Sequence, residues 1–147
     1  MALHVTSPAF AGGDRIPRAF TCDGRDEAVP LTVTGVPLGT ESFAVIMDDP
    51  DAPGGPFTHW LAYDLPNEGH VLRPEAGKTL ANDFGRVGYG GPCPPRSHGA
   101  HRYEVTVFAV DIACLNVRGA SRRDLEAALE GHTLARSTLV GRYQRPY

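Results

Sequence analysis

Short runs of apolar or alternating residues, separated by glycine and proline, dominate the chain. Seventeen glycines and thirteen prolines among 147 residues interrupt it every few positions. Such spacing leaves room for short strands and turns but for few long helices. The pattern predicts six strands, at residues 2–6, 31–34, 42–47, 58–65, 101–110 and 134–143. We therefore expect an all-β, β-rich fold with one or two short helices.

One helix is predicted after residue 120. Ser121 can cap it, and Asp124 stands at the third position of a capping-box pattern. Leu125 and Leu129 lie four positions apart and form an apolar stripe, and Gly131 marks the end. We expect this helix to pack against the strands.

Length and charge narrow the classes of function. A chain of 147 residues fits one domain, residues 1–147, which can bury a core without disulfides or metal. The net charge of -3 offers no field for nucleic acid or an anionic membrane. No apolar stretch approaches the roughly 20 residues needed to cross a bilayer. We expect a soluble protein that binds no nucleic acid and does not insert into membranes.

The cysteines are odd in number and lack close pairs. Cys22, Cys93 and Cys114 show no CxxC spacing, which argues against a disulfide framework and against a zinc site. The first ten residues also lack the basic start and apolar run of a signal peptide. These observations favour a reducing cytoplasm.

The first candidate site follows the predicted strand at residues 42–47. Asp49 and Asp51 alternate with prolines there, which indicates a shaped turn. From local sequence alone, a solvated hairpin loop is as good an interpretation as a site. However, His59 begins the next strand, so a hairpin would return it close to Asp49 or Asp51. A carboxylate beside an imidazole fixes its tautomer and favours its charged form.

The second candidate site is the glycine- and proline-rich loop at residues 85–99 and the strand that follows. Gly90 and Gly91 would let backbone amides approach a ligand, and the prolines would stiffen a nest for an anion. A stiff surface loop is the alternative, and the pattern alone favours it. The two-residue period of a strand places His101 and Tyr103 on the same face.

The two clusters together resemble the phosphatidylethanolamine-binding protein family, in its bacterial and archaeal branch, often called Raf kinase inhibitor-like. Two motifs carry the resemblance: Asp49-Pro50-Asp51-Ala52-Pro53 followed by His59-Trp60, and Gly91-Pro92-Cys93-Pro94-Pro95 followed by His101-Arg102-Tyr103. It extends over nearly the whole chain through Ile16-Pro17, Phe20-Thr21-Cys22-Asp23-Gly24, Asn82-Asp83-Phe84-Gly85 and Gly131-His132-Thr133-Leu134-Ala135.

The resemblance implies two packed antiparallel sheets in a Greek-key-type β-sandwich, with a pocket at one end. It also implies a candidate cis peptide at Ala52-Pro53, and a role for the main chain of Cys93 rather than for its thiol. The implied ligand-binding residues are Asp49, Asp51, His59, Cys93, Pro94, His101 and Tyr103. The resemblance implies no cofactor, no metal and no catalytic residue, and it admits a homodimer.

The predicted function is the binding of a small anion or phosphoryl group, carried by a metabolite, a headgroup or a protein, without catalysis. We expect His59, His101 and Tyr103 to donate hydrogen bonds to the anion while Asp49 orients a histidine, so that binding weakens as the pH rises. One alternative is a metal-dependent hydrolase that uses His59, His101 and Asp49. Another is an inhibitor of a kinase or protease that acts through protein contacts.

Overall fold

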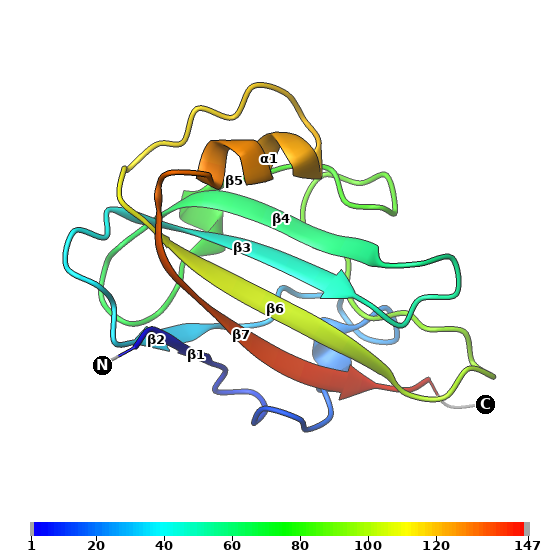
Figure 1. Cartoon of the computed structure of the whole chain (residues 1–147). Coiled ribbons are helices and arrows are strands. Elements are labelled where there is room, and N and C mark those ends of the chain that lie inside the picture. The colour runs from blue at the N-terminus through cyan, green and yellow to red at the C-terminus, as the bar shows by residue number, and fades with distance from the viewer. Residues whose placement is uncertain (1, 146–147) are drawn as a thin grey trace.

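A five-stranded antiparallel sheet forms the centre of the protein (Figure 1). The structure is a computed structural model and describes residues 2–145. The strand order is β5-β4-β3-β6-β7. The bounds are β3 Ser42–Asp49, β4 Phe57–Pro66, β5 Lys78–Thr79, β6 His101–Val110 and β7 Thr133–Tyr143.

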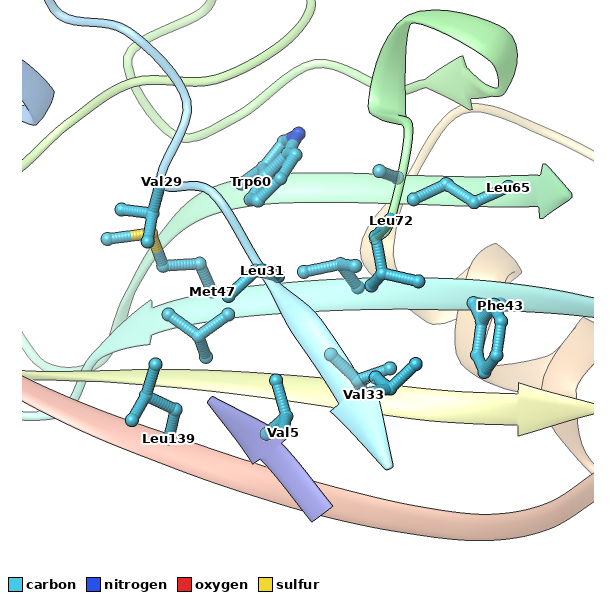
Figure 2. Packing of buried hydrophobic residues seen from close by; sticks show 14 of the residues in the cluster. Val5, Val29, Leu31, Val33, Phe43, Met47, Trp60, Leu65, Leu72 and Leu139 are labelled. Carbon is cyan, nitrogen blue, oxygen red and sulfur yellow. The ribbon is translucent and has the colours of Figure 1, made fainter. Parts of the chain in front are cut away.

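A smaller sheet covers one face of the large one. It pairs β1 (His4–Thr6) with β2 (Thr32–Thr34), antiparallel, with Val5 opposite Val33. Figure 2 shows the side chains of Val5 and Val33 over the large sheet, in a core that also holds Phe43 and Trp60. The short helix α1 (Arg122–Leu129) covers the other face, as Figure 1 shows.

The central strand β3 has apolar side chains on both faces because both faces are covered. Phe43, Val45 and Met47 belong to the core under β1 and β2. Ala44 and Ile46 alternate with them and belong to the core under α1. This two-sided burial explains why residues 43–47 form a continuous apolar run instead of an alternating one.

The ends of α1 follow the predicted capping pattern. The Ser121 side chain accepts a hydrogen bond from the Asp124 backbone amide, and the Asp124 carboxylate accepts one from the Ser121 backbone amide. Leu125 and Leu129 are buried, and Gly131 follows the helix with a positive φ of 81°. Two 3-10 turns complete the elements, at Arg18–Phe20 and Pro74–Ala76.

All six predicted strands and the predicted helix are present in the structure, to within two residues at each end. The predicted fold class, β-rich with two antiparallel sheets, is confirmed. The two-residue strand β5 was not predicted, because Lys78 and Thr79 are too few to form a pattern. The Ala52-Pro53 bond, a candidate cis peptide, is trans, as are the other peptide bonds of residues 2–145. Across the same residues, no helix is long and apolar enough to reach from one side of a bilayer to the other.

Candidate functional site

Three strand ends meet around a cavity of about 180 Å³. The end of β3 brings Asp49, the start of β4 brings His59, and the start of β6 brings His101 and Tyr103. Because β3 is antiparallel to both β4 and β6, the end of β3 lies beside the starts of its two neighbours. This topology brings together residues that are up to 54 positions apart, since 103 − 49 = 54.

A β-bulge aims His59 at the cavity. Met47 pairs with Trp60 while Asp48 pairs with Thr58, so His59 is the additional residue on β4. Regular alternation would point His59 away from the face that holds Trp60. The bulge resets the alternation, so His59 and Trp60 are both buried and His59 lines the cavity.

Asp49 is oriented by contacts to both of its carboxylate oxygens. Its Oδ2 lies 2.7 Å from Nδ1 of His101, and its Oδ1 accepts a hydrogen bond of 2.8 Å from the Asp51 backbone amide. The side chains of Asp49 and His101 are 5% and 3% exposed. The histidine that Asp49 orients is therefore His101, and a buried carboxylate with such a partner is well satisfied.

His101 has a hydrogen-bond partner at each ring nitrogen. Its Nε2 lies 2.8 Å from Nδ1 of His98, an exposed residue of the preceding loop. His101 was expected to donate a hydrogen bond to the anion, but both of its ring nitrogens already have partners within the protein. Direct donation would require the His98 contact at Nε2 to break.

Tyr103 carries a buried hydroxyl that lies near the Asp49 carboxylate without a well-formed hydrogen bond to it. The residue is 0% exposed, and its hydroxyl has no hydrogen bond of good geometry to any residue in the range 2–145. Burial, together with the nearby Asp49 charge, raises the pKa of Tyr103, so the phenol keeps its proton. Since Tyr103 lines the cavity, this O–H is a donor that a bound acceptor would satisfy.

The backbone of the 85–99 loop fixes the proton on His59. Nδ1 of His59 lies 2.6 Å from the carbonyl oxygen of Gly90, which can only accept, so Nδ1 carries the hydrogen. The hydrogen bond described for His59 is this one at Nδ1, and the Gly91 backbone also lies close enough to act on the pKa of the ring. Burial lowers the pKa of His59, against the opposing effects of the Gly90 carbonyl and Asp49. In the neutral ring, Nε2 is an acceptor; it becomes a donor when the ring is protonated.

His59 does not pair directly with a carboxylate, contrary to one expectation from the hairpin. Its direct hydrogen bond goes to Gly90, and Asp49 acts on it only through its charge. Asp51 lies outside the cavity, where it forms a two-pronged ion pair with Arg102 at 2.8 and 3.0 Å. This pairing lowers the pKa of Asp51 to about 2. Asp51 also accepts from the Arg102 backbone amide, so it ties the turn to β6.

The expectation that the cysteines form no disulfide was wrong. Cys22 and Cys93 are joined, with 71 positions between them in the sequence and 5.4 Å between their Cα atoms. Cys114 is exposed and has a free thiol. The odd number of cysteines is thus explained by one disulfide and one free cysteine. Cys93 lines the cavity, and its sulfur is bonded to Cys22.

The glycine-rich loop does not form the predicted nest of free amides. The Gly90 amide donates to the His59 carbonyl at 2.9 Å, and the Gly91 amide donates to the Asp26 carboxylate at 2.8 Å. A Cβ atom at residue 91 would lie 2.3 Å from the Phe20 carbonyl oxygen, so only glycine fits there. These amides hold the loop in place, and Pro94 and Pro95 then line the cavity as expected.

Two aromatic residues of the cavity wall were missed by sequence reasoning. Phe57 lies at the start of β4 and Phe84 in the loop after β5, and their ring centroids are 4.7 Å apart. The His59 ring lies within 5.3 Å of both, measured between centroids. Phe57 is adjacent to the predicted strand, and Phe84 lies in the Asn82-Asp83-Phe84-Gly85 motif of the family resemblance, but the motif did not place its ring in the cavity.

Comparison with known proteins shows the family of the chain. The family model of the phosphatidylethanolamine-binding proteins matches residues 6–144. The chain belongs to this family. A UPF0098 protein of Aquifex aeolicus is 48% identical over 152 residues, which cover 97% of this chain and 89% of the relative.

A solved structure and a second relative add to this comparison: the first shows the fold, and the second concerns the cellular compartment. A crystal structure of a phosphatidylethanolamine-binding protein homologue, CT736 of Chlamydia trachomatis, has a TM-score of 0.88 with 32% identity, and the match covers 98% of each chain. A Mycobacterium tuberculosis relative named putative lipoprotein LppC is 36% identical over 146 residues, covering 97% of this chain and 72% of the relative. Membership of the family thus fixes the fold of this chain but not its cellular compartment.

Proposed function

We propose that this member of the phosphatidylethanolamine-binding protein family binds a small oxyanion, such as phosphate or a phosphoryl group, in the cavity around Tyr103 and His59. Tyr103 donates its hydroxyl to one oxygen of the anion. His59 donates from Nε2 when it is protonated, or accepts a hydrogen from a P–OH group of the ligand. Asp49 and His101 hold each other in place next to these two groups.

The buried Tyr103 hydroxyl is the observation that carries this proposal. A buried polar atom without a partner costs about 1–3 kcal/mol. The structure retains one next to a cavity, beside the buried His59, whose ring also lines that cavity. An oxyanion would contact both groups at once, and the burial of Tyr103 and His59 would strengthen each contact.

Calorimetric titration with inorganic phosphate tests the proposal. Tyr103→Phe should lower the affinity about ten-fold or more, because a hydrogen bond to a charged group contributes about 1.5–3 kcal/mol. Tyr63→Phe is the matched control, since Tyr63 lies on β4 but does not line the cavity. Without ligand, Tyr103→Phe should unfold at the same urea concentration as the wild type or a higher one. Equal phosphate affinity in all three proteins would refute the proposal.

The metal-dependent hydrolase gains no support from the arrangement of its three expected ligands. The Asp49 carboxylate and the His101 ring bond to each other, and His98 covers the second nitrogen of His101. Within residues 2–145, no group of three or more His, Cys, Asp or Glu side chains is placed to hold a metal. The proposed anion binding therefore makes no use of a metal at these three residues.

Regulation of a kinase or protease, and the homodimer, stay predictions. A protein partner with a phosphorylated residue would use the same cavity, so free phosphate should compete with it. Sedimentation would measure the oligomeric state. The cytoplasmic location also stays a prediction. The Cys22–Cys93 disulfide weakens the argument for it, because disulfides are rare in a reducing cytoplasm.

A further inference from the structure

The cavity has more room than a bare oxyanion needs. Its volume of about 180 Å³ equals that of roughly six water molecules in the liquid. A single tetrahedral ion beside His59 and Tyr103 would fill only part of it. The remaining wall is apolar and comes from Ala52, Pro53, Phe57, Phe84, Pro94 and Pro95.

Phe84 is a fixed aromatic wall, although it lies in a loop. Its backbone amide donates to the buried Asn82 side chain at 3.0 Å, and its ring meets that of Phe57 edge to face. A Cβ atom at residue 90 would come within 2.5 Å of the Phe84 ring, so glycine at that position allows the ring to pack there. The Arg86 guanidinium also lies over the ring, 5.3 Å from its centroid.

Despite these contacts, Phe84 remains 41% exposed. A large aromatic side chain that is held rigid, lines a cavity and stays exposed offers apolar surface for a ligand to cover. The His59 ring contacts both the Phe84 ring and the Tyr103 ring, with a centroid distance of 5.3 Å in each case. Groups that attract an oxyanion and rings that attract an apolar body thus share one cavity.

We propose that the cavity selects oxyanions that carry a flat ring, such as aryl phosphates, over the bare ion and over alkyl esters. The inference rests on the proposed function, because the charged group of the ligand occupies the place beside His59 and Tyr103. The ring then contacts Phe57 and Phe84, in the offset or edge-to-face arrangements that aromatic pairs prefer. Pro53, Pro94 and Pro95 border the same space and limit the ligand to a small ring system.

A series of phosphate esters tests the inference on the unmodified protein. Calorimetry would compare inorganic phosphate, methyl phosphate, cyclohexyl phosphate and phenyl phosphate at one pH and salt concentration. Phenyl phosphate should bind roughly ten-fold more tightly than methyl phosphate, from burial of the ring and its aromatic contacts. It should also bind more tightly than cyclohexyl phosphate, which has similar apolar bulk but no flat ring.

Two outcomes would overturn the inference while leaving the proposed function intact. One is equal binding of methyl and phenyl phosphate, and the other is equal binding of cyclohexyl and phenyl phosphate. If neither inorganic phosphate nor any ester binds, the proposed function fails and the inference fails with it. These results are distinguishable in a single set of titrations.

A matched pair of variants assigns the effect to Phe84. Phe84→Leu keeps an apolar side chain but removes the ring, so the ratio of phenyl to methyl phosphate affinity should fall to about two-fold. Val87→Ala removes an apolar side chain that is 74% exposed and does not line the cavity, and the ratio should stay at its wild-type value. An unchanged ratio in Phe84→Leu would overturn the assignment. Phenyl phosphate and a short phosphotyrosine peptide, titrated in parallel, would distinguish a free metabolite from a modified protein as the source of the aryl group.

Discussion

Removal of the Cys22–Cys93 disulfide should cause a large loss of stability. The bridge closes a loop of 71 positions. In the chain-entropy description, such a loop lowers the free energy of folding by about 4 kcal/mol through its effect on the unfolded chain. Domains of this kind are stable by only about 5–15 kcal/mol in total. The double variant Cys22→Ser/Cys93→Ser should therefore unfold at a melting temperature lower by roughly 10 °C.

Urea denaturation of the wild type and the double variant, both under oxidising conditions, would measure this loss. Cys114→Ser is the control, because that thiol is exposed and free, and its removal should leave the unfolding midpoint unchanged. Titration of thiols in the oxidised, unfolded wild type should find one thiol, and three after reduction. A double variant within 1 kcal/mol of the wild type would show that the disulfide contributes little stability, and three thiols before reduction would show that it does not form.

Three further predictions concern the site. Asp49→Asn replaces the carboxylate that pairs with His101 and should lower the free energy of unfolding by about 1.5–3 kcal/mol in urea denaturation; Glu126→Gln, at an exposed ion pair, should change it by less than about 1 kcal/mol. Because the pKa of His59 is lower in the folded protein, the unfolded chain binds a proton at this histidine first as the pH falls. The contribution of His59 to stability is therefore present above pH 6.5 and is lost as the pH falls below it. His59→Gln should flatten the dependence of the melting temperature on pH in this range. Because an anion favours protonated His59, phosphate affinity should rise as the pH falls below 6.5. Calorimetry in buffers of different ionisation enthalpy should detect the uptake of a proton on binding. A phosphate affinity that does not depend on pH would contradict this.

The elements of this fold were predictable where their determinants are local. The capping residues of α1 and the alternation in β6 lie within a few positions of each other, so Ser121, Asp124, His101 and Tyr103 could all be placed from the sequence. The convergence of Asp49 with His101 was expected only from the family resemblance. Nothing in the local pattern sets the pairing of β3 with β6 across more than 50 residues.

Most of the differences concern contacts between segments that are distant in the chain. The Cys22–Cys93 bridge depends on two loops that meet only in the folded protein. Asp51 was expected in the cavity, but an arginine on β6 draws it to the surface. The bulge at His59 and the position of Phe84 likewise depend on neighbouring strands and loops. Sequence periodicity contains no information about such partners.

A crystal structure grown in phosphate would test the central claim most directly. We expect electron density for a tetrahedral ion within hydrogen-bond distance of the Tyr103 hydroxyl and of Nε2 of His59, with the Asp49–His101 contact retained. A cavity that holds only water at saturating phosphate, with Tyr103 still lacking an anionic partner, would contradict it.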